Sequence, residues 1–355
     1  MAHEENSPLN ITPGAIRFNT DSMKLEYFRI GTEGGSTSSY AGIGTFAAGE
    51  WVQITTDSPD IQTGGTRGLR FGGNTPTSTD TIDYISVDTT GNAIDFGNLT
   101  ESRPSTGSGI ASRTRGITFM GYVSGYQNKI EFVTISSTGN SQDFGDLLAA
   151  KQQGSGCGSA TRGVIFAGTD AGSDVNTMEY ITIAQTGNSV DFGDCSHTVS
   201  ACGAMSSSTR GIIYAGNISP AKTNVIDFFT ISTQGNSADF GDGTVARSNL
   251  YSGGNSVRGI AGGGAAPSSV NSIEYITIAT LGDAADFGDL TDARQLAASS
   301  SSPTRMCFMG GANPGDSNII DYVQIMSKGD AIDFGDLTTG CSEAKGCSNG
   351  HGGLG

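Results

Sequence analysis

The carboxylates of this chain have both the residue type and the regular spacing that catalysis or metal binding could use. The phrase Asp-Phe-Gly-Asp, as in GNSVDFGD at 187–194, recurs six times with small variations. Paired carboxylates act as general acid and base in glycoside hydrolysis, and clustered carboxylates bind calcium. Because these acids repeat at a regular period, we expect them to serve the scaffold rather than catalysis or a calcium ring. The first aspartates of the phrase are Asp95, Asp143, Asp191, Asp239, Asp286 and Asp333.

Arginines recur with the same period, at Arg67, Arg115, Arg162, Arg210, Arg258 and Arg305. One interpretation is a central ring that holds an anion; the other, which we favour, is six ion pairs that hold neighbouring units together. The first aspartate of each phrase could pair with the arginine or accept backbone N–H bonds, and a buried ion pair must be well hydrogen-bonded. Asn98 replaces the final aspartate in the first unit, which indicates a position that needs an acceptor rather than a charge.

Histidines and cysteines show no spacing typical of catalysis or metal binding. The three histidines, His3, His197 and His351, occupy unrelated contexts, and no Ser/His/Asp spacing or phosphate-binding loop is present. The six cysteines have no CxxC spacing, so we expect reduced, buried thiols. We therefore predict a protein that is not an enzyme and that has no metal ion and no cofactor.

Composition narrows the class of protein further. The 355 residues include 54 glycines and only 35% apolar residues, and the formal charge is −16. A nucleic-acid-binding protein needs a basic footprint, which this sequence lacks. We find no secretory signal and no apolar stretch of membrane-spanning length. We expect a soluble protein made in a cytoplasm, with no nucleic-acid partner and no membrane insertion.

Short β-strands must position the repeated residues. The phrases lie 48, 48, 48, 47 and 47 residues apart, a period typical of repeat architectures. An acid–aromatic pair twelve residues before each first aspartate lies in an alternating run, such as IDYISV from Ile82, which predicts a strand. The Gly-Asn or Gly-Asp pair that follows predicts a tight hairpin turn into the strand that carries the phrase.

Two further strands complete each unit. The arginine begins one of them, and a small-residue stretch such as GSGIAS at 107–112 predicts the other. Four antiparallel strands in six units predict an all-β fold, a six-bladed β-propeller. The first unit lacks its small-residue strand, so we expect residues 341–350 to supply it and close the ring. The phenylalanines expected to pack between blades are Phe96, Phe144, Phe192, Phe240, Phe287 and Phe334.

The loops that differ most between units are the candidates for recognition. They span residues 74–80, 122–128, 169–175, 217–223, 265–271 and 312–317, and their position in the repeat places all six on one face. Polar and tyrosine side chains there suit hydrogen bonding to sugars or protein, although they equally suit solvated loops. The candidate residues are Tyr122, Tyr126, Asn128, Asp170, Asp174, Asn217, Lys222, Asn313 and Asp316.

Residues 1–58 do not repeat and predict a small β-rich module, before a propeller at 59–355. Three strands are expected at 15–19, 24–30 and 51–55, with NTDS as a turn and Trp51 as a core anchor. The module is too small to form a good hydrophobic core of its own, so we expect it to pack against the propeller or against another chain.

Two resemblances cover nearly the whole chain. The run PGAIRFNTDSMKLEYF followed by EWVQIT resembles a β-rich module of tail fibres and other appendages of tailed bacteriophages. The repeats, with TRG at 66–68 and GNAIDFGNLT at 91–100, resemble kelch-like propeller repeats in virion proteins of marine phages, although phenylalanine stands where kelch repeats carry tryptophan. The resemblance implies a virion protein whose front module attaches it to other tail or capsid proteins.

These observations together predict a non-enzymatic virion protein of the tail-fibre or appendage type. We expect the propeller to attach to a host-surface glycan or protein, and the chain to form a homo-oligomer. The alternatives are an architectural block of the tail or capsid surface without host recognition, and a glycan-degrading propeller enzyme.

Overall fold

The computed structural model describes residues 15–19, 24–30, 49–53, 66–104 and 107–354. Contacts divide the chain into two units, Met1–Ile61 and Gln62–Gly355. The boundary that we predicted between residues 58 and 59 lies outside the described residues.

The N-terminal unit contains a three-stranded antiparallel sheet. Its strands are β1 (Ile16–Asn19), β2 (Lys24–Ile30) and β3 (Gly49–Gln53), in the order β1-β2-β3. The first two strands match the predicted ranges to within a residue, and the third begins two residues before the predicted start. Most of the predicted NTDS turn and the side chain of Trp51 lie outside the described residues.

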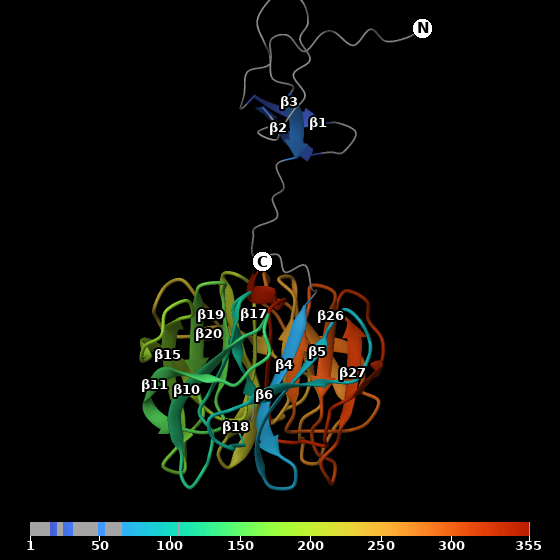
Figure 1. Cartoon of the computed structure of the whole chain (residues 1–355). Helices are drawn as coiled ribbons and strands as arrows, with labels where there is room; N and C mark the ends of the chain where they lie inside the picture. Colours follow the sequence, from blue (N-terminus) through green and yellow to red (C-terminus); the bar gives the residue numbers. More distant parts are fainter. Residues whose placement is uncertain (1–14, 20–23, 31–48, 54–65, 105–106, 355) are drawn as a thin grey trace, which may run out of the picture. The chain divides into compact units, whose positions relative to one another are not determined.

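The second unit is a six-bladed β-propeller, which confirms the fold predicted from the repeat (Figure 1). Each blade orders its strands as predicted: the small-residue strand, then the arginine, acid–aromatic and DFGD strands. Blade 1 consists of β29 (Lys345–Ser348), β4 (Arg67–Asn74), β5 (Ser78–Ser86) and β6 (Ile94–Asn98). Blade 2 consists of β7 (Gly107–Ser108), β8 (Ile110–Ala111), β9 (Arg115–Phe119), β10 (Gln127–Thr134) and β11 (Gln142–Lys151).

The other four blades follow the same plan. Blade 3 consists of β12 (Ser155–Gly158), β13 (Arg162–Phe166), β14 (Thr169–Asp170), β15 (Ser173–Thr182) and β16 (Val190–Val199). Blade 4 consists of β17 (Gly203–Ser206), β18 (Arg210–Ile218), β19 (Ala221–Thr230) and β20 (Ala238–Asp242). Blade 5 consists of β21 (Tyr251–Gly254), β22 (Arg258–Gly262), β23 (Ser272–Thr277) and β24 (Ala285–Asp289). Blade 6 consists of β25 (Ala298–Ser301), β26 (Arg305–Met309), β27 (Ile319–Gln324) and β28 (Ile332–Asp336), and the 3₁₀ helix η1 (Gly352–Leu354) follows β29.

The last strand of the chain closes the ring. β29 pairs antiparallel with β4, and Cys347 lies opposite Leu69, so the C-terminal strand completes blade 1 as predicted. Blade 2 departs from the repeat because its inner strand is divided. β8 pairs with β9, whereas β7 pairs parallel with β29. The closing strand is therefore hydrogen-bonded on both of its edges.

The two ends of the propeller carry different segments. The loops between the second and third strands of the blades lie at the same end as the crossovers between blades, since Asn74 bridges Ser342 and Asn217 bridges Ser200. We call this end the loop face. β4 begins at the opposite end, which we call the terminal face, and η1 lies there too (Figure 1). The backbone of Gly350 packs against Thr66 at that end.

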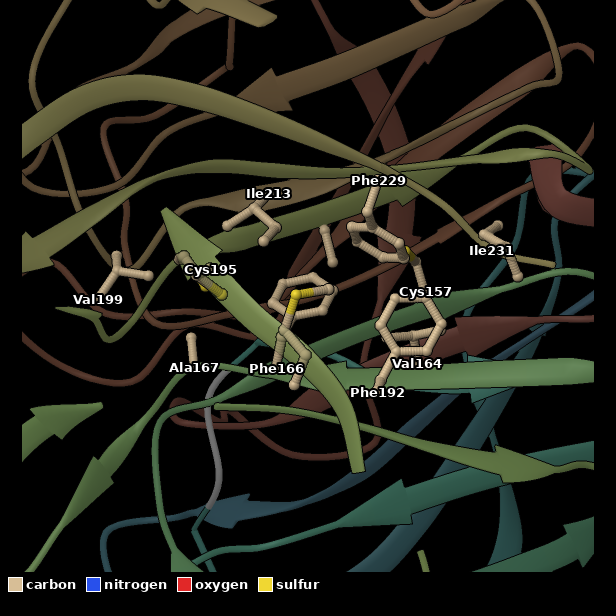
Figure 2. Close-up of a cluster of buried hydrophobic side chains, with 13 residues drawn as sticks. Cys157, Val164, Phe166, Ala167, Phe192, Cys195, Val199, Ile213, Phe229 and Ile231 are labelled. Carbon is tan, nitrogen blue, oxygen red and sulfur yellow. The ribbon is translucent and has the colours of Figure 1, made fainter. Parts of the chain in front are cut away.

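The core lies between the blades. Six hydrophobic clusters each combine residues of two neighbouring blades, and each contains one phenylalanine of the DFGD phrase. Figure 2 shows the cluster between blades 3 and 4, in which Phe192 of β16 meets Phe229 of β19 at a centroid distance of 5.5 Å. Burial of each such ring contributes roughly 1.5–3 kcal/mol, so the blades depend on their neighbours for stability.

Candidate functional site

The Gly-Asn pairs join each blade to the one before it. The backbone N–H of Gly139 in blade 2 donates to the carbonyl of Phe96 in blade 1, at 2.8 Å. A second hydrogen bond joins the same two blades, because the Oδ1 of Asn140 accepts the N–H of Asn98 at 3.1 Å. The predicted tight hairpin turn is therefore wrong: seven residues separate β5 from β6, and equivalent loops reach the neighbouring blade. Gly97 must lack a side chain because a Cβ would overlap the carbonyl of Gly139.

The repeated arginines hold blades together by a route that the sequence did not indicate. Arg115 stacks over the ring of Phe132 in its own blade, 4.6 Å from the centroid, and donates to the carbonyl of Ile183 in the next blade at 2.9 Å. Every repeated arginine stacks on a ring of its own blade and donates to a backbone carbonyl of the next blade, although Arg305 uses the carbonyl of Asp88, one residue beyond the equivalent of Ile183. The rings that they cover are Tyr84, Phe132, Tyr180, Phe228, Tyr275 and Tyr322.

Both interpretations of these arginines are therefore corrected. They form no ion pairs within the described residues, and they do not surround the axis. The first aspartates of the phrase are exposed, and their side chains accept no hydrogen bond from the described part of the chain. The physical reason is geometric: the arginine faces an aromatic ring on the adjacent strand, and a backbone carbonyl satisfies its guanidinium without a buried anion.

Buried ion pairs do exist, but they use the acids of the acid–aromatic pairs. All six acids are at most 1% exposed, and they are Asp83, Glu131, Glu179, Asp227, Glu274 and Asp321. Five of them pair with a cation. These pairs are Arg70–Asp83 and Arg103–Glu131 at 2.6 Å, Lys151–Glu179 at 2.5 Å, Arg247–Glu274 at 3.3 Å, and Arg294–Asp321.

The sequence contains a signal for most of these cations, although they were not among the predicted site residues. A basic residue stands eight positions after the first aspartate of the phrase in four of the six units, at Arg103, Lys151, Arg247 and Arg294. In the sixth unit the position is Cys341, and Arg70 of β4 supplies the cation instead, with its Nη1 donating to the sulfur of Cys341. In the four units with a basic residue, this position lies at the end of the DFGD strand or in the crossover that follows it, so these four ion pairs join one blade to the next. The Arg70–Asp83 pair lies within blade 1.

Blade 4 is the exception, because Val199 occupies the position of the cation. The carboxylate of Asp227 accepts from the hydroxyls of Ser196 and Ser237, at 2.6 and 2.7 Å, while its Oδ1 has no hydrogen-bond partner. The Nδ1 of His197 lies 2.8 Å from the Ser196 hydroxyl and 3.9 Å from the carboxylate.

These three side chains bring a serine, a histidine and an aspartate together, although sequence spacing showed no such set. Ser196 lies between the other two, whereas a catalytic triad places the histidine in the middle. The equivalent threonines in four other blades donate to the equivalent acids, so the hydroxyl of Ser196 serves the seam between blades. Those threonines are Thr100, Thr244, Thr291 and Thr338.

Serine hydroxyls line the axis of the ring. The inner strands of blades 3 to 6 have one edge without a strand partner, and serine hydroxyls of a neighbouring blade donate to carbonyls on that edge. Ser299 donates to the carbonyl of Ser252 at 2.7 Å, and Ser301 to that of Gly254 at 2.9 Å. Ser108 reaches across the axis to within 3.1 Å of the hydroxyl of Ser252. This leaves a cavity of about 40 Å³, which is room for only a few water molecules.

Lys345 is the one inner-strand position in the described chain that places an ammonium group in the interior. Its Nζ donates to the carbonyl of Gly154 at 2.5 Å and lies 4.5 Å from the centroid of the Phe119 ring. Burial lowers the pKa of this lysine to about 7. At the terminal face, His351 donates from Nε2 to the carbonyl of Ala111 and accepts the N–H of Gly353 at Nδ1, and burial lowers its pKa.

The cysteines are all buried and free, as the sequence indicated. Burial raises the pKa of the thiols of Cys157, Cys202 and Cys347 to about 12, which keeps them protonated and unreactive. Across the described ranges no group of three or more histidine, cysteine, aspartate or glutamate side chains could hold a metal ion.

The candidate recognition residues divide into two groups on the loop face. Three of them connect neighbouring loops: Asp174 accepts the N–H of Ser219 at 2.9 Å, Lys222 donates to the carbonyl of Ala265 at 2.8 Å, and Asn217 pairs by its backbone with Ser200. The others keep exposed or half-buried side chains. They are Tyr122, Tyr126, Asn128, Asp170, Asn313 and Asp316.

Comparison with known proteins identifies no family for this chain. It matches no protein-family description and no curated protein sequence. Among the residues that the structure covers, no helix is long and apolar enough to cross a membrane.

Proposed function

We propose that this chain is a non-enzymatic structural protein of a phage virion, of the tail-fibre or appendage type, and that its propeller attaches to the host surface. The observation that carries the proposal is the division between the two faces. The polypeptide enters the propeller at the terminal face, where Thr66 leads into β4, and the loops of differing sequence lie at the opposite face. The loop face is therefore the surface that we assign to contact with a partner.

The buried repeated acids and the repeated arginines are used in contacts between strands and blades, which leaves the loops as the candidates for recognition. The six acids of the acid–aromatic pairs and the six repeated arginines hold the blades together, so they serve the rigidity of the ring. A rigid ring that presents short loops is a common basis for binding, because recognition residues concentrate on loops positioned by a scaffold. The resemblance of the front module to tail-fibre modules supports the virion assignment.

The test uses purified particles and the full chain. Mass spectrometry of particles should detect the protein, and the purified full-length chain should bind host cells saturably and block phage adsorption. Absence from particles would reject the virion assignment. Presence in particles without binding to cells, for a folded chain, would favour the architectural role instead.

A further inference from the structure

The loop of blade 2 on the loop face carries an aromatic pair. Tyr122 and Tyr126 bridge each other through their backbones, and their rings meet edge to face at a centroid distance of 5.9 Å. The N–H of Val123 donates to the carbonyl of Gly125 at 3.1 Å, and that of Tyr122 to the carbonyl of Pro104 at 3.2 Å. The loop is thus a short, hydrogen-bonded structure.

The same bridge and internal hydrogen bond occur in two other blades without tyrosines. Ala265 bridges Ser269 in blade 5, and Ala312 bridges Asp316 in blade 6. The internal bond also recurs, from the N–H of Ala266 to Ser268 and from that of Asn313 to Gly315. Because alanine with serine or aspartate supports this loop, its fold does not require the aromatic pair. The two tyrosines need another explanation.

Tyr122 and its neighbour expose apolar surface to solvent. Tyr122 is 44% exposed and Val123 is 43% exposed, whereas the other five variable loops contain no aromatic residue. Exposed apolar groups on a hydrogen-bonded loop suit a contact surface, because little conformational freedom is lost when a ligand binds.

The nearby charges favour an uncharged ligand. Lys129 lies 3.6 Å from Glu101 and donates to Thr100, and Arg103 pairs with Glu131, so these cations have carboxylate partners. The chain as a whole carries a formal charge of −16. An anionic ligand would meet repulsion here.

We infer that Tyr122 and Tyr126 form a binding site for the apolar face of a neutral sugar ring. The negative face of a tyrosine ring attracts the polarised C–H groups of a pyranose, and one sugar face is comparable in size with one ring. The exposed amide of Asn128, in the same loop, is suited to hydrogen bonds with hydroxyl groups. A stable protein partner would need about 800 Å² on each side, far more than two side chains offer. This inference rests on the proposed attachment function and names its ligand class.

The test compares matched variants of the full chain on immobilised neutral hexasaccharides of glucose, galactose and mannose, and on host cells. Tyr122→Ala with Tyr126→Ser reproduces the residues of blade 5, so the loop should keep its fold. We expect it to lose binding to at least one hexasaccharide by roughly tenfold or more. Tyr122→Phe should retain binding, because stacking needs the ring and not the hydroxyl. Ala312→Tyr with Asp316→Tyr, added to the double variant, should restore part of the affinity from blade 6.

Each outcome separates this inference from the proposed function. Equal binding by wild type and the double variant would overturn the inference, as would wild-type binding to cells without binding to any hexasaccharide. In both cases attachment itself would stand. Failure of the wild type to bind either cells or hexasaccharides would overturn both. Thermal unfolding of each variant, with an unchanged transition, would show that lost binding reflects the site.

Discussion

At the scale of single residues, position in the seam decides what a carboxylate does. Asp95 in the DFGD phrase is exposed, whereas Asp83, on the strand beside it, is buried and paired with Arg70. Buried charges require a partner, since desolvation of an unpaired ion is expensive. The acids of the acid–aromatic pairs therefore form the buried ion pairs of the propeller, four of them across seams and one within blade 1, and Asp227 is the member whose cation position is filled by a valine.

This difference predicts unequal costs for the same substitution. Asp321→Asn leaves Arg294 buried beside an amide and should destabilise the propeller by about 3–5 kcal/mol. Asp227→Asn removes a carboxylate that has no such cation and should cost about 1 kcal/mol. Urea unfolding of both variants measures the free energies. Equal losses would show that the ion pair contributes nothing beyond the hydrogen bonds of the acid.

At the scale of elements, β29 is the strand on which the ring depends. It pairs with β4 on one edge and β7 on the other, and it places Lys345 in the interior. Burial lowers the pKa of this lysine from 10.5 to about 7. The unfolded chain thus binds the proton more tightly than the folded chain.

The lowered pKa of Lys345 makes the stability of the protein depend on pH. Between about pH 7 and 10.5 the unfolded state carries more protons at Lys345, so this residue makes stability rise with pH and fall on acidification. Lys345→Met removes the effect and should stabilise the protein most at pH 7 and below. The difference in unfolding free energy between variant and wild type should shrink by roughly 1.4 kcal/mol per pH unit toward pH 10. A difference that stays constant with pH would contradict a lowered pKa.

At the scale of the whole molecule, the blades are not independent. Every hydrophobic cluster combines two blades, and Gly352 and Gly353 of η1 pack against the inner strands of blades 3 and 4 although they follow blade 1 in the chain. A ring held in this way should unfold as one cooperative unit.

Truncation tests the closure. A chain ending at Ser342 loses β29 and η1 and leaves an edge of β4 unpaired. We expect its Tm to fall by roughly 10 °C or more, with association through the open edge. A chain ending at Asn349 retains β29 and should lose only a few degrees, about 2–4 °C for each kcal/mol. Calorimetry measures the Tm of both chains, and light scattering measures association. An unchanged Tm for the shorter chain would refute closure by β29.

The amino-acid sequence alone determined the number of blades, the order of their strands and the closing strand, because period and alternation are local properties that a strand repeat must satisfy. It also indicated that Phe192 and its equivalents are buried between blades. The tertiary structure alone decided the partners. Arg115 reaches Ile183, 68 residues away, and Arg103 meets Glu131 across a seam. Such contacts depend on how adjacent sheets face one another, and the spacing of residues within one repeat does not determine that orientation. The tyrosine loop of blade 2 also depends on the tertiary structure. The sequence shows two tyrosines, and only the bridge and hydrogen bond that recur in blades 5 and 6 show that the fold of the loop does not need them.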